Sequence, residues 1–152
     1  MKILMVCLGN ICRSPVAEGL MRKIAQEKGI KLTVDSAGTS GHHAGEAPDR
    51  RSQKNALKNG IDISDLRSRK FLKEDLENFD FIYVMDRSNY TNVMRLASNN
   101  EQKEKIKFFL NEEMDVPDPW YGGEDGFEIV FQLIKKRCEI IVNEITENKK
   151  TL

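Results

Sequence analysis

The sequence is poor in the features that mark secreted, membrane-spanning and nucleotide-binding proteins. It has only three cysteines in 152 residues, an odd number that argues for reduced thiols rather than a disulfide framework. The longest apolar run, Ile3 to Leu8, has six residues, whereas a membrane span needs about 18 and a signal-peptide core about 7 to 15. Neither G-x-x-x-x-G-K-[ST] nor G-x-G-x-x-G occurs. We therefore expect a cytoplasmic protein that makes no contact with membranes.

An excess of charge of one sign is also missing. Lysine plus arginine number 24, aspartate plus glutamate number 24, and the formal net charge is zero. Because a polyanion is attracted by a net positive field, nucleic acid is not expected as a partner. The length, with 39% hydrophobic and 32% charged residues, predicts one globular domain over residues 1–152. We expect a monomer or a weak dimer.

Short apolar segments alternate with amphipathic segments along the chain. We predict strands at about residues 2–7, 32–37, 79–85 and 106–110, and helices at about 14–29, 49–59, 88–97 and 127–145. Ser14 is the predicted N-cap of the first helix because Pro15 follows it. The segments 39–48 and 115–126 are expected to be loops, and the stretch through Arg69 and Lys70 is expected to be irregular.

Strands that alternate with helices predict parallel pairing and right-handed crossovers. The expected fold is therefore a three-layer α/β/α domain with a central four-stranded parallel sheet, of the flavodoxin-like or Rossmann-like type. In such sheets ligands bind beyond the carboxyl ends of the strands. Cys7 ends the first predicted strand, so it is expected at that edge.

The segment that joins the first strand to the first helix combines residue types suited to a phosphate group. A loop that curls toward a helix N-terminus can aim several backbone N–H groups at one oxyanion. A helix N-terminus and an arginine also favour the thiolate of a nearby cysteine, so Cys7 is a candidate nucleophile. Arg13 offers a planar fork for two phosphate oxygens. The predicted phosphate-binding residues are Leu8, Gly9, Asn10, Ile11, Cys12, Arg13 and Ser14.

Four residues of this loop have supporting roles in the interpretation. Gly9 is expected to adopt a positive φ and to let the backbone approach the ligand closely. Ser14 is expected to donate its hydroxyl to the thiolate, and Asn10 to tie the loop together through its amide. Cys12 could trap an oxidised Cys7 as a disulfide. The alternatives are an inert core thiol at Cys7 and a small buried spacer at Cys12.

The loop resembles the C-x5-R-S signature at the N-terminus of the low molecular weight protein tyrosine phosphatases. The resemblance covers nearly the whole chain, through Ser36-Ala37-Gly38-Thr39, Met85-Asp86-Arg87-Ser88-Asn89 and Asp118-Pro119-Trp120-Tyr121. It implies an enzyme without cofactor or metal that hydrolyses phosphotyrosine in proteins or peptides through a cysteinyl-phosphate. Inorganic phosphate and other oxyanions are then expected to inhibit it.

The resemblance also implies roles for residues outside the loop. Asp118, between two prolines, is expected to be the general acid of the first step and the base of the second; by itself it would be interpreted as a solvated turn residue. Trp120 and Tyr121 are expected to wall a slot for a flat ring. Asp86 resembles the family aspartate that holds the phosphate loop in shape, with a strand-end turn residue as the alternative.

The chain departs from the family pattern in the substrate pocket. His42-His43 stands where relatives usually carry Trp-His, so imidazole replaces an aromatic wall beside Ile11. No cluster of ligands with zinc spacing accompanies the two histidines, so no metal site is predicted. Two alternative functions stay open: a protein arginine phosphatase on the same scaffold, which tends to have threonine in place of Ile11, and a non-catalytic phosphate-binding or thiol redox-sensor module.

Overall fold

The computed structural model describes residues 1–110, 114–119 and 123–150. Its strands form one parallel sheet in the order β2-β1-β3-β4. Their bounds are Lys2–Cys7 for β1, Thr33–Gly38 for β2, Phe81–Val84 for β3 and Ile106–Phe108 for β4. The predicted four-stranded parallel sheet is confirmed.

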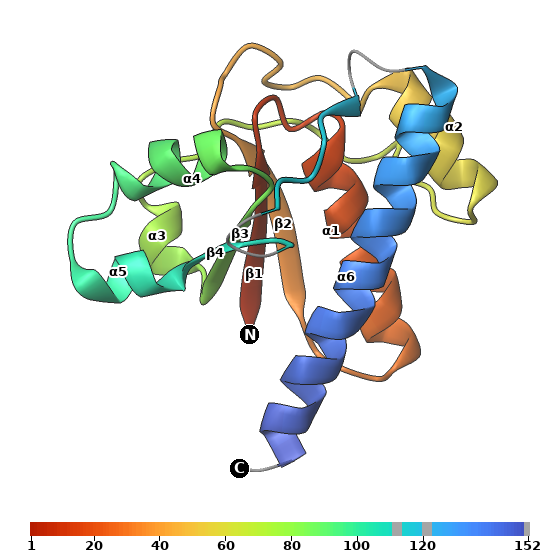
Figure 1. The fold of residues 1–152 in the computed structure, drawn as a ribbon. Helices are drawn as coiled ribbons and strands as arrows, with labels where there is room; N and C mark the ends of the chain where they lie inside the picture. The colour runs from red at the N-terminus through yellow and green to blue at the C-terminus, as the bar shows by residue number, and fades with distance from the viewer. Residues whose placement is uncertain (111–113, 120–122, 151–152) are drawn as a thin grey trace.

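Helices cover both faces of this sheet (Figure 1), which confirms the predicted three layers. On one face lie α1 (Arg13–Glu27), α2 (Arg50–Lys58) and α6 (Glu124–Lys150), and on the other lie α3 (Asp75–Asn78), α4 (Arg87–Met94) and α5 (Asn100–Lys105). Within the described residues, no helix combines the length and apolarity that crossing a bilayer requires.

Strand β1 is buried on both faces because its side chains alternate between two cores. Ile3 and Met5 pack with α1 and α6, whereas Leu4 and Val6 pack with the residues of the opposite layer. All four are fully buried. A continuous apolar run is what a central parallel strand requires, since helices cover both of its faces.

The strand order places Cys7 at a switch point of the sheet. The chain leaves β1 to form β2 on one side and later returns to form β3 on the other side. Crevices open where the strand order reverses in this way, beyond the carboxyl ends of the strands. Cys7 is the last residue of β1, so its side chain lies at the edge where such a crevice is expected.

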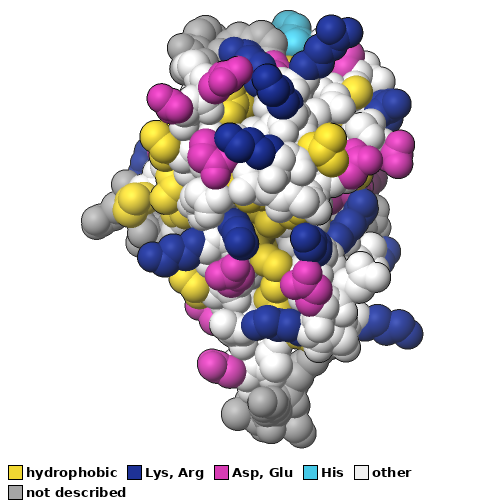
Figure 2. Space-filling view, turned by 90° about the vertical axis from the view of Figure 1, so that its right-hand side faces the viewer, with side chains coloured by type: hydrophobic (Ala, Val, Ile, Leu, Met, Phe, Trp, Pro, Cys, Tyr) yellow, Lys and Arg dark blue, Asp and Glu magenta, His cyan; other side chains and the backbone are white. Residues whose placement is uncertain are grey.

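The outer surface mixes charges of both signs. Figure 2 views the side on which α2 and α6 lie, and there the Lys and Arg side chains are interspersed with Asp and Glu side chains. This arrangement agrees with the zero formal net charge of the sequence.

Several local predictions were wrong. Ser14 is not the N-cap of α1, because the helix begins at Arg13 and the Ser14 hydroxyl faces Cys7 instead. The last helix begins at Glu124, before the predicted start at Phe127, and acidic side chains in its first turn favour a helix N-terminus. The short helices α3 and α5 were not predicted; an asparagine side chain, that of Asn99, caps α5.

Gly38 ends β2 directly against the loop that follows β1. A Cβ at this position would lie 2.9 Å from the Leu8 carbonyl oxygen and 3.1 Å from the Asn10 nitrogen. Both are backbone atoms, so we expect Gly38→Ala to displace the loop and to lower the free energy of unfolding by about 1–3 kcal/mol. Urea unfolding measures this. Gly41→Ala is the control, since the atom nearest to a Cβ there is Cδ of the flexible Lys70 side chain, at 3.4 Å; equal stability of the two variants would contradict the prediction.

Candidate active site

The segment from Cys7 to Ser14, called the Cys7 loop below, is held from outside through its carbonyl oxygens. A trans peptide points its N–H away from the preceding C=O, so the N–H groups of the following residues face the inside of the loop. The four outer bonds are donated by Thr39 N to Cys7 O (2.9 Å), Ser40 N to Leu8 O (2.9 Å), Ser68 Oγ to Gly9 O (3.0 Å) and Asp49 N to Ile11 O (2.8 Å).

The sulfur of Cys7 lies inside this ring of amides. Its side chain is buried, the Asn10 N–H donates to Sγ at 3.3 Å, and Ser14 Oγ lies 3.0 Å from Sγ. The first turn of α1 follows directly, and the positive end of a helix dipole stabilises negative charge. A hydrogen-bond donor and a helix N-terminus are therefore both directed at this sulfur.

Asn10, not Gly9, has the left-handed backbone conformation of the loop. Its φ is 57°, a conformation that asparagine tolerates better than most residues. The expectation of a positive φ at Gly9 was therefore wrong. Gly9 is instead approached by a side chain, since a Cβ there would lie 3.1 Å from His43 Cδ2.

The Asn10 side chain makes three hydrogen bonds that tie the loop to its surroundings. Its Nδ2 donates to Ser14 Oγ at 2.8 Å and to Ser36 Oγ at 2.9 Å, and its Oδ1 accepts from the Arg69 backbone N–H at 3.0 Å. The amide thus connects the Cys7 loop to β2 and to the segment that precedes α3.

Arg13 is buried, and one of its nitrogens donates to two acceptors. Its Nη1 donates to Asp86 Oδ2 at 2.8 Å and to the Val116 carbonyl oxygen at 2.9 Å. Burial alone would lower the pKa of Arg13, but the Cys7 sulfur and Asp86 raise the pKa above its ordinary value. A fixed cation therefore stands beside the Cys7 loop, where it can bind an oxyanion.

Two aspartates flank this guanidinium. Asp86 accepts from the Asn89 N–H at 2.8 Å through its other oxygen, and so caps α4 while it contacts Arg13 rather than the loop backbone. Asp118 Oδ2 lies 3.8 Å from Arg13 Nη2, and 34% of its side chain is exposed. A half-exposed carboxyl group beside the loop is placed so that it can exchange protons with a bound molecule and with water.

A cavity of about 390 Å³ opens over the Cys7 loop. Cavities of this size hold small ligands. Its lining comprises Cys7, Leu8, Gly9, Ile11, Cys12, Arg13, Ser40, His42, His43 and Asp118. Asn10 and Ser14 do not line it but contact Cys7, and Asp86 contacts Arg13. Trp120 and Tyr121 lie outside the described residues.

The histidines at the rim differ in their contacts. His43 Nδ1 lies 2.7 Å from Glu46 Oε2, which orients the ring above Gly9. His42 is exposed. In residues 1–110, 114–119 and 123–150, no three His, Cys, Asp or Glu side chains come together as a potential metal site.

The two other cysteines are buried thiols. Burial, with the nearby charges of Asp49 and Cys7, raises the pKa of Cys12 to about 12. Burial also raises the pKa of Cys138, whose Sγ points at the Ala17 carbonyl oxygen in the core. Both side chains are therefore protonated at neutral pH, and Cys138 is a packing residue, as its place on the apolar stripe of the last helix predicted.

Comparison with known proteins shows what kind of protein this is. A family model described as low molecular weight phosphotyrosine protein phosphatase matches residues 2–151. The chain belongs to this family. It is 38% identical to the low molecular weight protein-tyrosine-phosphatase YfkJ of Bacillus subtilis over 154 residues, which cover 97% of both chains. The expected family, and with it the enzyme class of protein-tyrosine phosphatases, is confirmed.

Solved structures of other proteins share the fold. The protein tyrosine phosphatase of Entamoeba histolytica, crystallised with Hepes in the active site, superposes with a TM-score of 0.91 at 38% identity, covering 98% of this chain and 99% of its own. Wzb of Vibrio vulnificus, solved in complex with benzylphosphonate, superposes with a TM-score of 0.84 at 27% identity, covering 94% and 97%.

Sequence reasoning missed the residues that support the loop from behind. Ser36 was part of the Ser-Ala-Gly-Thr segment but was given no role, and Ser40 was expected only as part of a surface loop. Ser68 and Arg69 lie in the stretch that was expected to be irregular, and no local pattern connects them with residues about 60 positions earlier in the chain. Only the tertiary structure brings these segments together.

Proposed function

We propose that this phosphatase hydrolyses phosphotyrosine in two steps at the Cys7 loop. In the first, the Cys7 thiolate attacks phosphorus, the S–P bond forms, and the bond to the phenolic oxygen breaks while Asp118 gives that oxygen its proton. In the second, water attacks the cysteinyl-phosphate and passes a proton to the Asp118 carboxylate. The S–P bond breaks, which releases inorganic phosphate and regenerates the Cys7 thiolate.

The observation that carries this proposal is the buried sulfur inside a ring of amides, with a fixed guanidinium at its side. The inward N–H groups of the Cys7 loop and the Arg13 fork would bind the three oxygens that do not react. In an in-line displacement these oxygens spread to equatorial positions, where the same donors would bond them better, so these donors stabilise the transition state more than the substrate. Other oxyanions would compete for this site.

The substrate class follows from the walls of the cavity. Leu8 and Ile11 present apolar surface above the loop, which suits an aromatic ring better than a charged guanidino group. The benzylphosphonate bound by Wzb is an aryl ligand of this kind. We propose Trp120 and Tyr121 as the remaining walls, and His42 and His43 as the part of the rim that meets the peptide around the phosphotyrosine.

Cys12 supplies a second thiol for protection against oxidation in this proposal. If Cys7 is oxidised to a sulfenic acid, the Cys12 sulfur can displace water and form a Cys7–Cys12 disulfide, which thiols reduce again. Such an enzyme works where thiols are kept reduced, so we place it in the cytoplasm. The family match over residues 2–151 supports a single catalytic domain.

The proposed function predicts hydrolysis of p-nitrophenyl phosphate in the presence of a chelator. In a panel of phosphotyrosine, phosphoserine and phosphoarginine peptides, we expect kcat/KM to be highest for phosphotyrosine by about 100-fold, since the slot would match a flat ring. Release of inorganic phosphate measures the hydrolysis of p-nitrophenyl phosphate and of each peptide. A preference for phosphoarginine would identify the arginine phosphatase, and phosphate binding without turnover would identify a non-catalytic module.

A further inference from the structure

Residues 68–70 run alongside the Cys7 loop as a short extension of the sheet. Lys70 forms a parallel bridge with Gly38 at the end of β2, and the Gly38 N–H donates to the Arg69 carbonyl oxygen at 2.8 Å. From this position the segment makes two bonds to the loop, from Ser68 Oγ to the Gly9 carbonyl oxygen and from the Arg69 N–H to Asn10 Oδ1.

The Arg69 N–H determines which way the Asn10 amide points. A backbone N–H can only donate, so the atom that faces it is the amide oxygen, and Nδ2 must then face Ser14 and Ser36. Ser14 Oγ accepts from Asn10, which leaves its own hydrogen for the Cys7 sulfur 3.0 Å away. One backbone hydrogen bond therefore orients Ser14 as a donor to the thiolate.

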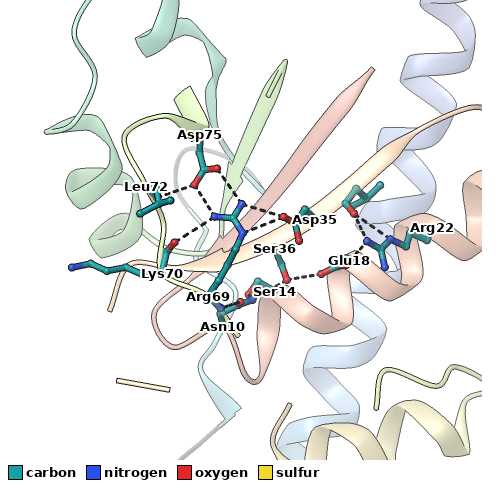
Figure 3. Close-up of polar contacts among 11 residues, drawn as sticks. Asn10, Ser14, Glu18, Arg22, Asp35, Ser36, Arg69, Lys70, Leu72 and Asp75 are labelled. Atoms are coloured by element: carbon teal, nitrogen blue, oxygen red, sulfur yellow. Dashed lines mark hydrogen bonds and ion pairs between the residues drawn. The ribbon is translucent and has the colours of Figure 1, made fainter. Parts of the chain in front are cut away.

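The hydrogen bonds of Ser36, the second acceptor of Asn10 Nδ2, are consistent with this orientation (Figure 3). Ser36 Oγ donates to Glu18 Oε1 at 2.6 Å, so its oxygen is available to accept from Asn10. The Glu18 side chain is only 3% exposed and is paired with Arg22 at 2.6 Å. A buried carboxylate needs donors, and the hydroxyl of Ser36 is one of them.

The position of the Arg69 backbone is set by its own side chain. The guanidinium donates to both oxygens of Asp75, at 2.9 and 3.1 Å, and through Nε to Asp35 Oδ2 at 3.1 Å. Asp75 begins α3 and its side chain is 7% exposed, whereas Asp35 belongs to β2. Burial opposes the charge of Arg69, but the two carboxylates raise its pKa. The Arg69 side chain thus links α3 to β2, and the Arg69 backbone contacts the Cys7 loop (Figure 3).

From these contacts we infer that Arg69 is a positioning residue for catalysis: by bridging Asp35 and Asp75, it holds its N–H against Asn10 and so keeps Ser14 donating to the Cys7 thiolate. The inference rests on the proposed role of Cys7. Asparagine at φ 57° is strained relative to ordinary backbone, so the loop depends on such outside contacts to keep its shape.

Substituting Arg69 tests this inference. We expect Arg69→Ala to lower kcat for p-nitrophenyl phosphate by about 10- to 100-fold, since small displacements of reacting groups cost this much, and to change KM little. Loss of a donor destabilises the thiolate, so the pH midpoint of Cys7 alkylation by iodoacetate should move upward. Arg69→Lys, which keeps the charge but not the fork, should be intermediate.

The alkylation measurement has a matched control and a clear readout. Arg67→Ala removes a neighbouring exposed arginine that donates to the Ser64 and Leu66 carbonyl oxygens, and it should leave kcat and the alkylation profile as in the wild type. Cys12 and Cys138 are protonated and buried, so alkylation near neutral pH reports Cys7. Mass spectrometry of the labelled peptide identifies the site.

A double-mutant cycle with Asn10→Ala decides whether Arg69 acts through Asn10. If it does, adding Arg69→Ala to Asn10→Ala lowers kcat by much less than Arg69→Ala does alone. If the double variant instead loses kcat by the product of the two single losses, the two residues act independently and the inference is overturned. A folded Arg69→Ala protein with unchanged kcat and alkylation profile would overturn it as well. If Arg69→Ala does not fold, Asp35→Asn and Arg69→Lys replace it. Both variants must then move the pH midpoint of Cys7 alkylation upward. Alkylation of Cys7 can be measured without turnover. A wild-type protein without phosphatase activity would therefore refute the proposed function but would leave the alkylation test of Arg69 intact.

Discussion

Cys7→Ser is expected to abolish turnover while the protein still binds inorganic phosphate. A serine hydroxyl is a far weaker nucleophile than a thiolate, and loss of a nucleophile in an enzyme costs on the order of 10⁴-fold or more in kcat. The donors that would hold the oxyanion are the backbone amides of the Cys7 loop and Arg13, none of which this substitution removes. Phosphate release assays measure the loss, and calorimetry measures the binding.

The same variant separates a catalytic loop from a binding loop. Binding should become at least as tight as in the wild type, because the negative sulfur that repels phosphate is gone. A Cys7→Ser protein that still hydrolyses p-nitrophenyl phosphate would contradict the covalent mechanism. A protein that neither binds nor reacts, although circular dichroism shows it to be folded, would contradict phosphate binding by the Cys7 loop.

Asp118→Asn is expected to slow substrates in proportion to the basicity of their leaving groups. A phenolate of ordinary tyrosine has a conjugate acid of pKa about 10 and needs a proton as it leaves, so loss of the general acid should cost about 10²- to 10⁴-fold. A more acidic phenol leaves without help, and its ester should be slowed much less. A series of aryl phosphates with graded leaving groups gives the slope of log kcat against leaving-group pKa.

Asp115→Asn is the matched control for that series. Asp115 lies in the same segment, and its Oδ1 accepts from the Arg87 N–H at 3.0 Å, a bond that asparagine can keep. We expect this variant to keep the wild-type slope. Equal slowing of all the esters by Asp118→Asn would remove Asp118 as the acid and leave it as a charged neighbour of Arg13.

The local parts of this site could be predicted from the sequence. A β-branched apolar run, a glycine, and a Ser-Pro helix start are neighbours in the chain, so they identify β1, the Cys7 loop and α1 with errors of only a residue or two. The fold class follows from the alternation of such elements. The misplaced N-cap shows the limit, because the Ser14 hydroxyl bonds to a neighbour in space rather than to its own helix.

The parts that could not be predicted depend on contacts between distant segments. Arg69, Ser68 and Ser36 carry no pattern that marks them as supports of Cys7, since their partners lie 26 to 59 positions away. The positive φ of the loop was likewise expected at Gly9 and not at Asn10, because glycine adopts it most readily. Helices α3 and α5 have only four and six residues, too few for hydrophobic periodicity to be read.

The ring of outer hydrogen bonds around the Cys7 loop has a consequence for folding. Its donors come from residues 39–40, 49 and 68, so the ring is incomplete until three separate stretches have docked beside the N-terminal strand. Pairings between remote positions form slowly. Recovery of enzymatic activity after dilution from denaturant should therefore coincide with the final cooperative transition, and a truncated N-terminal fragment that carries the whole signature should be inert.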